Sequence, residues 1–225
     1  YQNELGEVLR EVRNEEQSVQ GTIRVGLFVG FPREVLVRFL ARFAKDHPDA
    51  TLRLRYGSRD ELREALAEGR LDFAFALDAE DPGDRIQATA LYEEELLLVS
   101  RPALAKGRFD LARLSEVPVV DYYQGDPLVQ RWARHHFGEP AAALDVRVWA
   151  ATTQLVLDLV KNRVGVGVVP RHLVAGELER GSLRAIGPQR KPLRDIIWLK
   201  SRTGTWRSAA LDAFETEALQ ALTPH

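Results

Sequence analysis

The sequence predicts an α/β protein built on parallel sheet, and three observations support this. The stretch from Gly21 to Pro48 has the pattern of a strand, a loop and a helix. Two strand-helix-strand units follow one another up to residue 77, which requires parallel pairing with right-handed crossovers. The same alternation then starts again beyond residue 101. In such sheets ligands bind beyond the carboxyl ends of the strands, so we expect the binding loops there.

The first unit changes its hydrophobic period along its length. Apolar residues alternate in the strand, which ends in a small, turn-prone segment at 29–32. A wide apolar face of period 3.6 follows and predicts a helix that His47-Pro48 ends. The apolar positions are Ile23, Val25 and Leu27 in the strand, and Val35, Leu36, Phe39, Leu40 and Phe43 in the helix.

The second unit begins with a strand at 51–56, where apolar and polar residues alternate, so one face of the strand is expected to be wetter. Ser58 and Glu61 form the S-x-x-E pattern of a capping box, which predicts the start of a helix that ends at Gly69. The run 71–77 is almost entirely apolar and predicts a strand buried on both faces.

The remaining elements are predicted from similar patterns. The expected order is a strand at 88–91, a strand at 95–100, a short helix at 111–114, a strand at 117–122, a helix at 127–137, a strand at 146–149, a helix at 153–162, a strand at 166–169, strands at 183–186 and 196–199, and a closing helix at 211–222. Residues 1–20 carry only a narrow apolar stripe. This stripe predicts either pairing with another helix, as in a short coiled coil, or a frayed solvated helix.

Composition excludes several classes of protein. The 225 residues include no cysteine, which removes disulfides, catalytic thiols and thiolate metal sites. No apolar run is long enough to span a membrane, and there is no secretory signal pattern, so a cytoplasmic location is expected. The net charge of -2 gives no overall basic field for nucleic acid. Because residue 1 is tyrosine and methionine is absent, we expect a piece of a longer or processed protein.

Four motifs contain residues that occur at chemical sites, but none of them has the pattern that such a site requires. The acidic loop 78–84 has no accompanying histidine, and solvated loops are commonly acidic. The glycines at 165–167 follow a predicted helix and open a strand, which is the reverse of a dinucleotide loop. His135 and His136 would point about 100° apart on a helix and cannot share a metal. Asp121, Asp126 and Asp145 lack a nucleophile and base at motif spacing, so no enzyme and no cofactor is predicted.

Several motifs together resemble the effector-binding half of LysR-type transcriptional regulators. They are G-T-I-R-V-G, V-L-V-R-F-L-A-R-F-A-K-D-H-P-D, L-R-L-R-Y-G-S-R-D-E-L-R-E-A-L-A-E-G-R-L-D-F-A-F and E-E-E-L-L-L-V-S-R-P. The later motifs L-S-E-V-P-V-V and T-T-Q-L-V-L-D-L-V-K-N-R-V-G-V-G-V-V-P follow in the family's order. The resemblance covers residues 21–222.

The resemblance implies two Rossmann-like lobes joined by two crossing strands, as in type 2 periplasmic binding proteins. The first lobe would comprise residues 22–100 and 189–225, and the second residues 101–188. Residues 1–20 would be the end of the linker helix from an N-terminal winged helix-turn-helix, through which alone the parent protein would bind DNA. A periplasmic-type solute-binding protein is the alternative, and an encoded upstream secretion signal would favour it.

The resemblance also places the effector in a cleft between the lobes. The matching positions in the first lobe are Phe28, Val29 and Gly30, then Ser58, then Leu77. Relatives place a hydroxyl residue at the first turn and some place an arginine at the position of Leu77, so this chain favours a more apolar ligand. The capping box by itself explains Ser58, and a role in holding an anionic group stays open.

In the second lobe the matching segment is Tyr122, Tyr123, Gln124, Gly125 and Asp126, faced by Ala150, Ala151 and Thr152. Tyrosine offers an apolar ring and a hydroxyl to a ligand, although either ring could instead be packed under the loop. We expect an aromatic or mostly apolar effector, whose one carboxylate, if present, would lie near Ser58. The resemblance further implies a homodimer or homotetramer, with the helix 33–46 of one subunit against the helix 127–137 of another.

Overall fold

The computed structural model describes residues 19–79, 85–105, 107, 109–122, 127–138, 144–188, 191–204 and 207–223. The chain forms two compact units. Unit 2 is Glu93–Asp195, and unit 1 is the rest, ending at Tyr92 and resuming at Ile196. Two long strands, β4 (Ile86–Ser100) and β9 (Leu193–Arg202), each begin in one unit and end in the other. Along the described parts of the chain, no helix is both long and apolar enough to cross a membrane.

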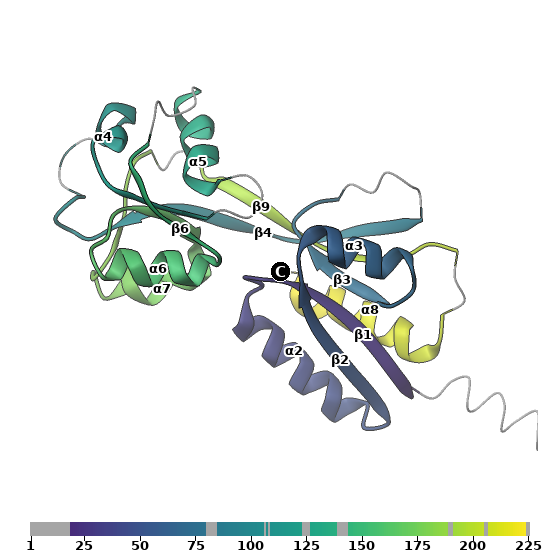
Figure 1. Cartoon of the computed structure of the whole chain (residues 1–225). Helices are drawn as coiled ribbons and strands as arrows, with labels where there is room; N and C mark the ends of the chain where they lie inside the picture. Colours follow the sequence, from purple (N-terminus) through teal and green to yellow (C-terminus); the bar gives the residue numbers. More distant parts are fainter. Residues whose placement is uncertain are drawn as a thin grey trace, which may run out of the picture. The chain divides into compact units, whose positions relative to one another are not determined.

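Unit 1 is a sheet covered by helices on both faces (Figure 1). Its strand order is β2-β1-β3-β9, with β1 parallel to both β2 and β3, and β3 antiparallel to β9. The parallel pairing predicted for the first two units is therefore confirmed. The elements are β1 (Gly21–Phe28), α2 (Arg33–Asp46), β2 (Ala50–Gly57), α3 (Arg59–Ala67), β3 (Phe73–Ala76) and α8 (Ala209–Leu222).

Two cores hold unit 1 together, one on each face of the sheet. On one face, α2 and α8 bury aromatic rings against β1 and β3; Phe43 and Phe214 are fully buried and their ring centroids lie 5.4 Å apart. On the other face, α3 packs closely over β1 because Gly26 has no side chain. A Cβ at Gly26 would lie 2.7 Å from Cδ2 of Leu62, so only glycine allows this approach.

Unit 2 repeats the layered arrangement. Strands β5 and β6 are parallel, and β4 is antiparallel to β7 and β8. Helix α5 covers one face with Trp132 and Val129, while α6 and α7 cover the other with Val156 and Val174. The elements are α4 (Leu111–Ser115), β5 (Val119–Tyr122), α5 (Leu128–Phe137), β6 (Val146–Ala150), α6 (Thr153–Lys161), β7 (Gly167–Pro170), α7 (Arg171–Glu179) and β8 (Arg184–Ala185).

Two sequence predictions of secondary structure were wrong. The segments 88–91 and 95–100 are one continuous strand, β4, because the intervening Glu93, Glu94 and Glu95 are each paired rather than forming a loop. Their partners are Arg194, His172 and Arg171, with contacts of 2.7, 2.8 and 2.5 Å. Helix α7 was not predicted at all. It begins after Pro170, a residue that ends a strand and is also tolerated at a helix start.

Candidate functional site

The carboxyl ends of the three parallel strands of unit 1 form a single edge that carries all the residues predicted for this lobe. Phe28 ends β1 and Val29 follows it, Ser58 follows β2, and Leu77 follows β3. Val29 is 38% exposed and Leu77 is 46% exposed. Large apolar side chains therefore stand open to solvent at the edge where ligands of this fold class bind. Gly30 adopts a φ of 108°, a conformation that suits glycine at the turn into α2.

The aromatic residues beside this edge belong partly to the core. The ring of Phe28 is half-buried and lies 5.6 Å from that of Phe31, which in turn lies 4.6 Å from Phe75. Phe31 is only 5% exposed, so it supports the edge from beneath. Phe28 can offer a ligand one side of its ring, while its other side packs in the protein.

Ser58 forms the predicted capping box with Glu61. The Ser58 hydroxyl donates to Oε2 of Glu61 at 2.9 Å, the Ser58 backbone N–H donates to the same oxygen at 2.7 Å, and the Glu61 N–H donates to the hydroxyl. These bonds lower the pKa of Glu61 below its ordinary value, the backbone N–H of Ser58 acting first. The predicted capping box is thus confirmed, and it accounts for Ser58 as the N-cap of α3.

A charged cluster next to Leu77 had not been predicted. Lys200 of β9 is only 4% exposed, and its Nζ lies 2.6 Å from Oδ1 of Asp78. The other oxygen of Asp78 lies 3.0 Å from Nε of Arg59, the first residue of α3. The sequence does contain one signal for this cluster, since Lys200 directly follows the apolar run 196–199. A lysine on a buried strand usually has a partner of opposite charge.

In unit 2, the carboxyl ends of β5 and β6 form a corresponding edge. The two strands are parallel and Tyr122 pairs with Ala150, so Tyr122, Ala151 and Thr152 lie at the same end of the sheet. Tyr122 is half-buried, Ala150 is fully buried, and Thr152 caps α6 by accepting the Leu155 N–H at 3.0 Å. Tyr123, Gln124 and Gly125, together with Asp126, lie outside the described residues.

Asp121 occupies the start of α5 at this edge. Its side chain is 1% exposed, and Oδ1 accepts the backbone N–H of Tyr122 at 2.8 Å and of Val129 at 3.0 Å. Burial raises the pKa of the Asp121 carboxyl above its ordinary value, and these backbone N–H groups offset part of that rise. The carboxyl group therefore caps a helix by accepting backbone N–H groups.

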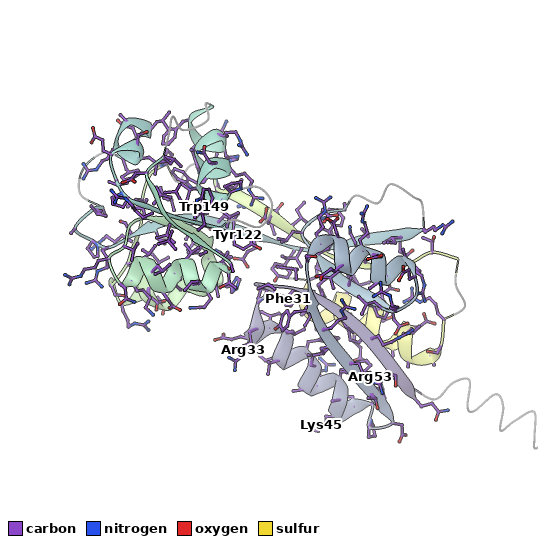
Figure 2. The ribbon with its side chains drawn as sticks, in the orientation of Figure 1. Phe31, Arg33, Lys45, Arg53, Tyr122 and Trp149 are labelled. Atoms are coloured by element: carbon purple, nitrogen blue, oxygen red, sulfur yellow. The ribbon has the colours of Figure 1, made fainter. Side chains whose placement is uncertain are left out.

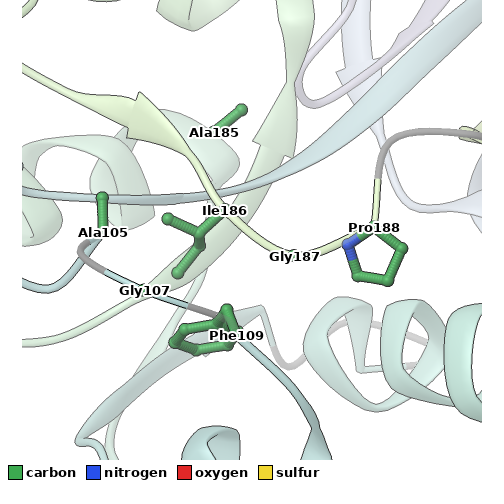
Figure 3. A pocket seen from close by; sticks show the side chains of 7 residues that line it. All are labelled: Ala105, Gly107, Phe109, Ala185, Ile186, Gly187 and Pro188. Carbon is green, nitrogen blue, oxygen red and sulfur yellow. The ribbon is translucent and has the colours of Figure 1, made fainter.

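Unit 2 also contains a cavity of about 410 Å³ away from the predicted site residues (Figure 3). Its floor includes Gly187, which has a φ of 82° and lies over the indole ring of Trp132. Among the described residues that line the cavity, every side chain is uncharged. The lining residues are Ala105, Gly107, Phe109, Ala185, Ile186, Gly187 and Pro188.

No group of three or more histidine, aspartate or glutamate side chains in the described residues is arranged to hold a metal ion. His135 and His136 lie next to each other on α5, but His136 packs its ring against Trp132 with centroids 4.2 Å apart. Burial, with a smaller contribution from His135, lowers the pKa of His136 to about 4. His136 is therefore a neutral packing residue at physiological pH.

The sequence pattern of the LysR substrate binding domain matches residues 16–223. The chain belongs to this family. The regulator AbaB of Streptomyces antibioticus is 34% identical over 169 residues, which are 71% of this chain and 55% of that protein. A probable hydrogen peroxide-inducible genes activator of Mycobacterium avium is 29% identical over 167 residues, or 72% of this chain and 52% of that protein. The chain thus spans about half the length of these curated relatives.

Solved structures of LysR regulatory domains share the fold. The cofactor-binding domain of the Cbl transcriptional regulator matches with a TM-score of 0.74 and 19% identity, over 92% of this chain and 90% of that one. The CcmR regulatory domain of Synechocystis PCC6803, in complex with 2-PG, matches at 0.73 and 15%, over 90% and 98%. The effector-binding domain of QuiR, in complex with shikimate, matches at 0.71 and 19%, over 90% and 97%.

The family assignment and the shared fold confirm the predicted α/β fold, which is of the type 2 periplasmic-binding-protein kind. The family assignment also confirms that this LysR domain is the effector-binding part of a regulator and not an enzyme. Within each unit, the structure brings the described site residues to one sheet edge. The roles of individual residues in binding stay predictions.

Proposed function

We propose that this LysR domain senses a small, aromatic or mostly apolar effector in a cytoplasmic transcription regulator. The residues proposed to contact it are Phe28, Val29, Gly30, Ser58, Leu77, Tyr122, Tyr123, Gln124, Gly125, Ala151 and Thr152. One observation carries the proposal of an apolar effector: Val29 and Leu77 are exposed at the carboxyl edge of unit 1. Water-exposed apolar side chains at such an edge favour a ligand that removes them from water.

Calorimetric titration of indole, benzyl alcohol and a short acyl amide tests the effector class. Replacing Leu77 by serine removes an apolar contact without touching the core, and we expect at least one of these probes to bind about tenfold more weakly to that variant. Leu77→Met is the matched control, because it keeps an apolar side chain of similar volume at the same position and should bind the probe as wild type does. Tight binding of highly charged phosphates alone would contradict the proposal.

We further propose that effector binding reaches DNA through the geometry of an oligomer. A ligand that prefers one arrangement of the protein shifts the equilibrium toward it by its difference in affinity. The winged helix-turn-helix of the parent protein would then be repositioned on DNA. Family membership and the helix-turn-helix regulators among the relatives support this part of the proposal.

The surfaces that support pairing of two copies are exposed apolar side chains outside the edges described above. In unit 1 these are Val37 on α2 and Leu54 and Tyr56 on β2, with exposures of 53%, 44% and 61%. Charged residues lie on the same elements, Arg33 and Lys45 on α2 and Arg53 on β2 (Figure 2). An apolar centre with a charged rim is typical of a protein interface.

In unit 2, the exposed apolar side chains lie on β6 and α6 rather than on α5. Trp149 is 52% exposed and Leu155 is 44% exposed, whereas the apolar residues of α5 are buried inside the unit except for Phe137, which is half-buried. We therefore propose that α2 and β2 of one copy contact β6 and α6 of the other, in place of the α2 and α5 pairing that the resemblance implied. Two such contacts satisfy a two-fold axis.

Sedimentation at micromolar concentration tests this pairing. We expect a dimer that Trp149→Glu converts to monomer, because a buried unpaired carboxylate in an interface is strongly unfavourable. Arg134→Glu on the exposed side of α5 is the control and should leave the dimer intact. A monomeric wild-type domain, or a dimer broken by the α5 substitution alone, would contradict the proposed surfaces.

A further inference from the structure

The groups that would bind an anion at the edge of unit 1 are already occupied by carboxylates of the protein. Lys200 and Arg59 are the two cations next to Leu77, and both contact Asp78, at 2.6 and 3.0 Å. The side chain of Asp78 is 20% exposed and that of Lys200 is 5% exposed, so the pair is shielded from water and salt. An effector carboxylate approaching these cations would meet the carboxylate of Asp78 first.

The start of α3 is occupied in the same way. Both the N–H and the hydroxyl of Ser58 donate to one oxygen of Glu61, and the resulting low pKa keeps that carboxyl ionised at neutral pH. An effector carboxylate placed at Ser58 would have to displace Glu61 from two hydrogen bonds. It would also lie beside a like charge, which opposes binding.

The helix start in unit 2 has its own internal carboxyl group. Asp121 accepts backbone N–H groups of Tyr122 and Val129 and is almost completely buried. These N–H groups point where an anionic ligand would bind at an open helix start. At α5 that position is taken by a side chain that the fold encloses.

We infer that Asp78 is a specificity-determining residue whose carboxylate takes the place of an effector anion on Arg59 and Lys200, so that this edge selects uncharged effectors. The inference rests on the proposed function of the edge and goes beyond it by naming the charge of the ligand. Glu61 and Asp121 act in the same direction at the two helix starts. The edge then distinguishes uncharged from anionic effectors in two ways, because apolar contacts favour the former and the carboxylate of Asp78 repels the latter.

A gain of anion binding tests the inference independently of the natural effector. Benzoate and benzyl alcohol are nearly equal in shape and differ in charge, and each is titrated into wild type and Asp78→Asn by calorimetry or amide chemical shifts. We expect benzoate to bind Asp78→Asn about tenfold or more tightly than it binds wild type, because the carboxylate of Asp78 no longer repels the probe or competes with it for Arg59 and Lys200. Benzyl alcohol should bind both proteins equally.

Two further variants exclude simpler explanations. Asp60→Asn on α3 changes the net charge equally, but Asp60 is 85% exposed and contacts Arg63 rather than Lys200 or Arg59. This variant should bind benzoate as wild type does. Asp78→Asn combined with Lys200→Met should lose most of the gain while retaining the folded circular dichroism spectrum. This result would show that the buried ammonium holds the probe.

Equal benzoate affinity in wild type and Asp78→Asn overturns the inference, whether both bind it or neither does. An equal gain in Asp60→Asn also overturns it, because net charge would then explain the effect. These outcomes differ from failure of the proposed function, which would appear as absence of binding of every uncharged probe to wild type. The gain in Asp78→Asn can still be measured in that case.

Discussion

The depressed pKa of His136 predicts that the protein is less stable at about pH 5 than at about pH 7.5. In the folded state the pKa is about 4, against 6.5 for a free side chain. A group whose pKa is depressed by folding contributes stability above its unfolded pKa, and this contribution is lost as the pH falls toward the folded pKa. The loss therefore begins near pH 6.5 and is complete near pH 4.

The size of the effect follows from the two pKa values. At pH 5 an unfolded imidazole is almost fully protonated while His136 is almost fully neutral, which corresponds to a loss of about 2 kcal/mol if the whole difference counts. Because the ring is only partly buried and the charge of His135 is screened by solvent, we expect about 1 kcal/mol. The lost energy is the cost of charging an imidazole that packs against Trp132.

Urea denaturation at the two pH values measures this loss in wild type and in His136→Phe. Phenylalanine keeps a ring against Trp132 and does not titrate, so the variant should lose about 1 kcal/mol less than wild type between the two pH values. His135→Gln is the control, since it removes the neighbouring charge and leaves His136 in place; most of the loss should remain. Equal pH dependence of wild type and His136→Phe would refute the reasoning.

Two substitutions of buried contacts give further predictions. Gly187→Ala should cost about 3 kcal/mol, because its Cβ would lie 2.4 Å from Trp132 in a left-handed conformation. Gly181→Ala, where φ is also positive but the space around the Cβ is open, should lower the free energy of unfolding by only about 1 kcal/mol when both variants are compared by thermal denaturation. Equal losses in the two variants would contradict a clash at Gly187. Asp72→Ala should cost about 2–4 kcal/mol, because the backbone N–H and guanidinium of Arg24 lose their acceptor. Arg24→Met should lower the free energy of unfolding by less, about 1 kcal/mol, since Arg24 is 41% exposed. Urea denaturation measures both losses, and a larger loss for Arg24→Met than for Asp72→Ala would contradict the prediction.

Local patterns in the sequence were sufficient for most elements of the fold. The period change after Gly30 placed α2 at its observed bounds, 33–46, because burial of one helix face requires a 3.6-residue repeat. The capping box of Ser58 and Glu61 involves residues only three positions apart, so both partners are visible in one short stretch. The continuity of β4 was missed for the opposite reason, since Glu94 and Glu95 are paired with residues 78 and 76 positions away.

The candidate site also divides into features set by residues close together in the sequence, which could be predicted, and features set by distant pairs, which could not. The end of the first predicted strand identified the loop that carries Val29, and the resemblance to LysR-type regulators identified Leu77; the exposure of both side chains agrees with a role in binding. The charged cluster could not be found this way. Asp78 and Lys200 are 122 residues apart, and only the pairing of β3 with β9 brings them together. The charges beside Leu77 are paired with one another, so their presence is compatible with the more apolar ligand that the sequence favours.

The internal pairing explains why the shared fold does not determine the effector. The Cbl domain has the same fold at 19% identity, and at that distance the similarity fixes the arrangement of strands and helices but not the side chains at their edges. Glu61 and Asp121 are helix caps, so changing either affects the stability of a helix as well as the charge of the edge. Asp78 caps no helix and lies in the segment after β3, so a neutral residue there leaves both helix starts intact, although the buried ammonium of Lys200 loses a carboxylate partner and the unit loses stability. Of the three carboxylates, Asp78 is therefore the one at which the charge of the edge can be changed without removing a helix cap.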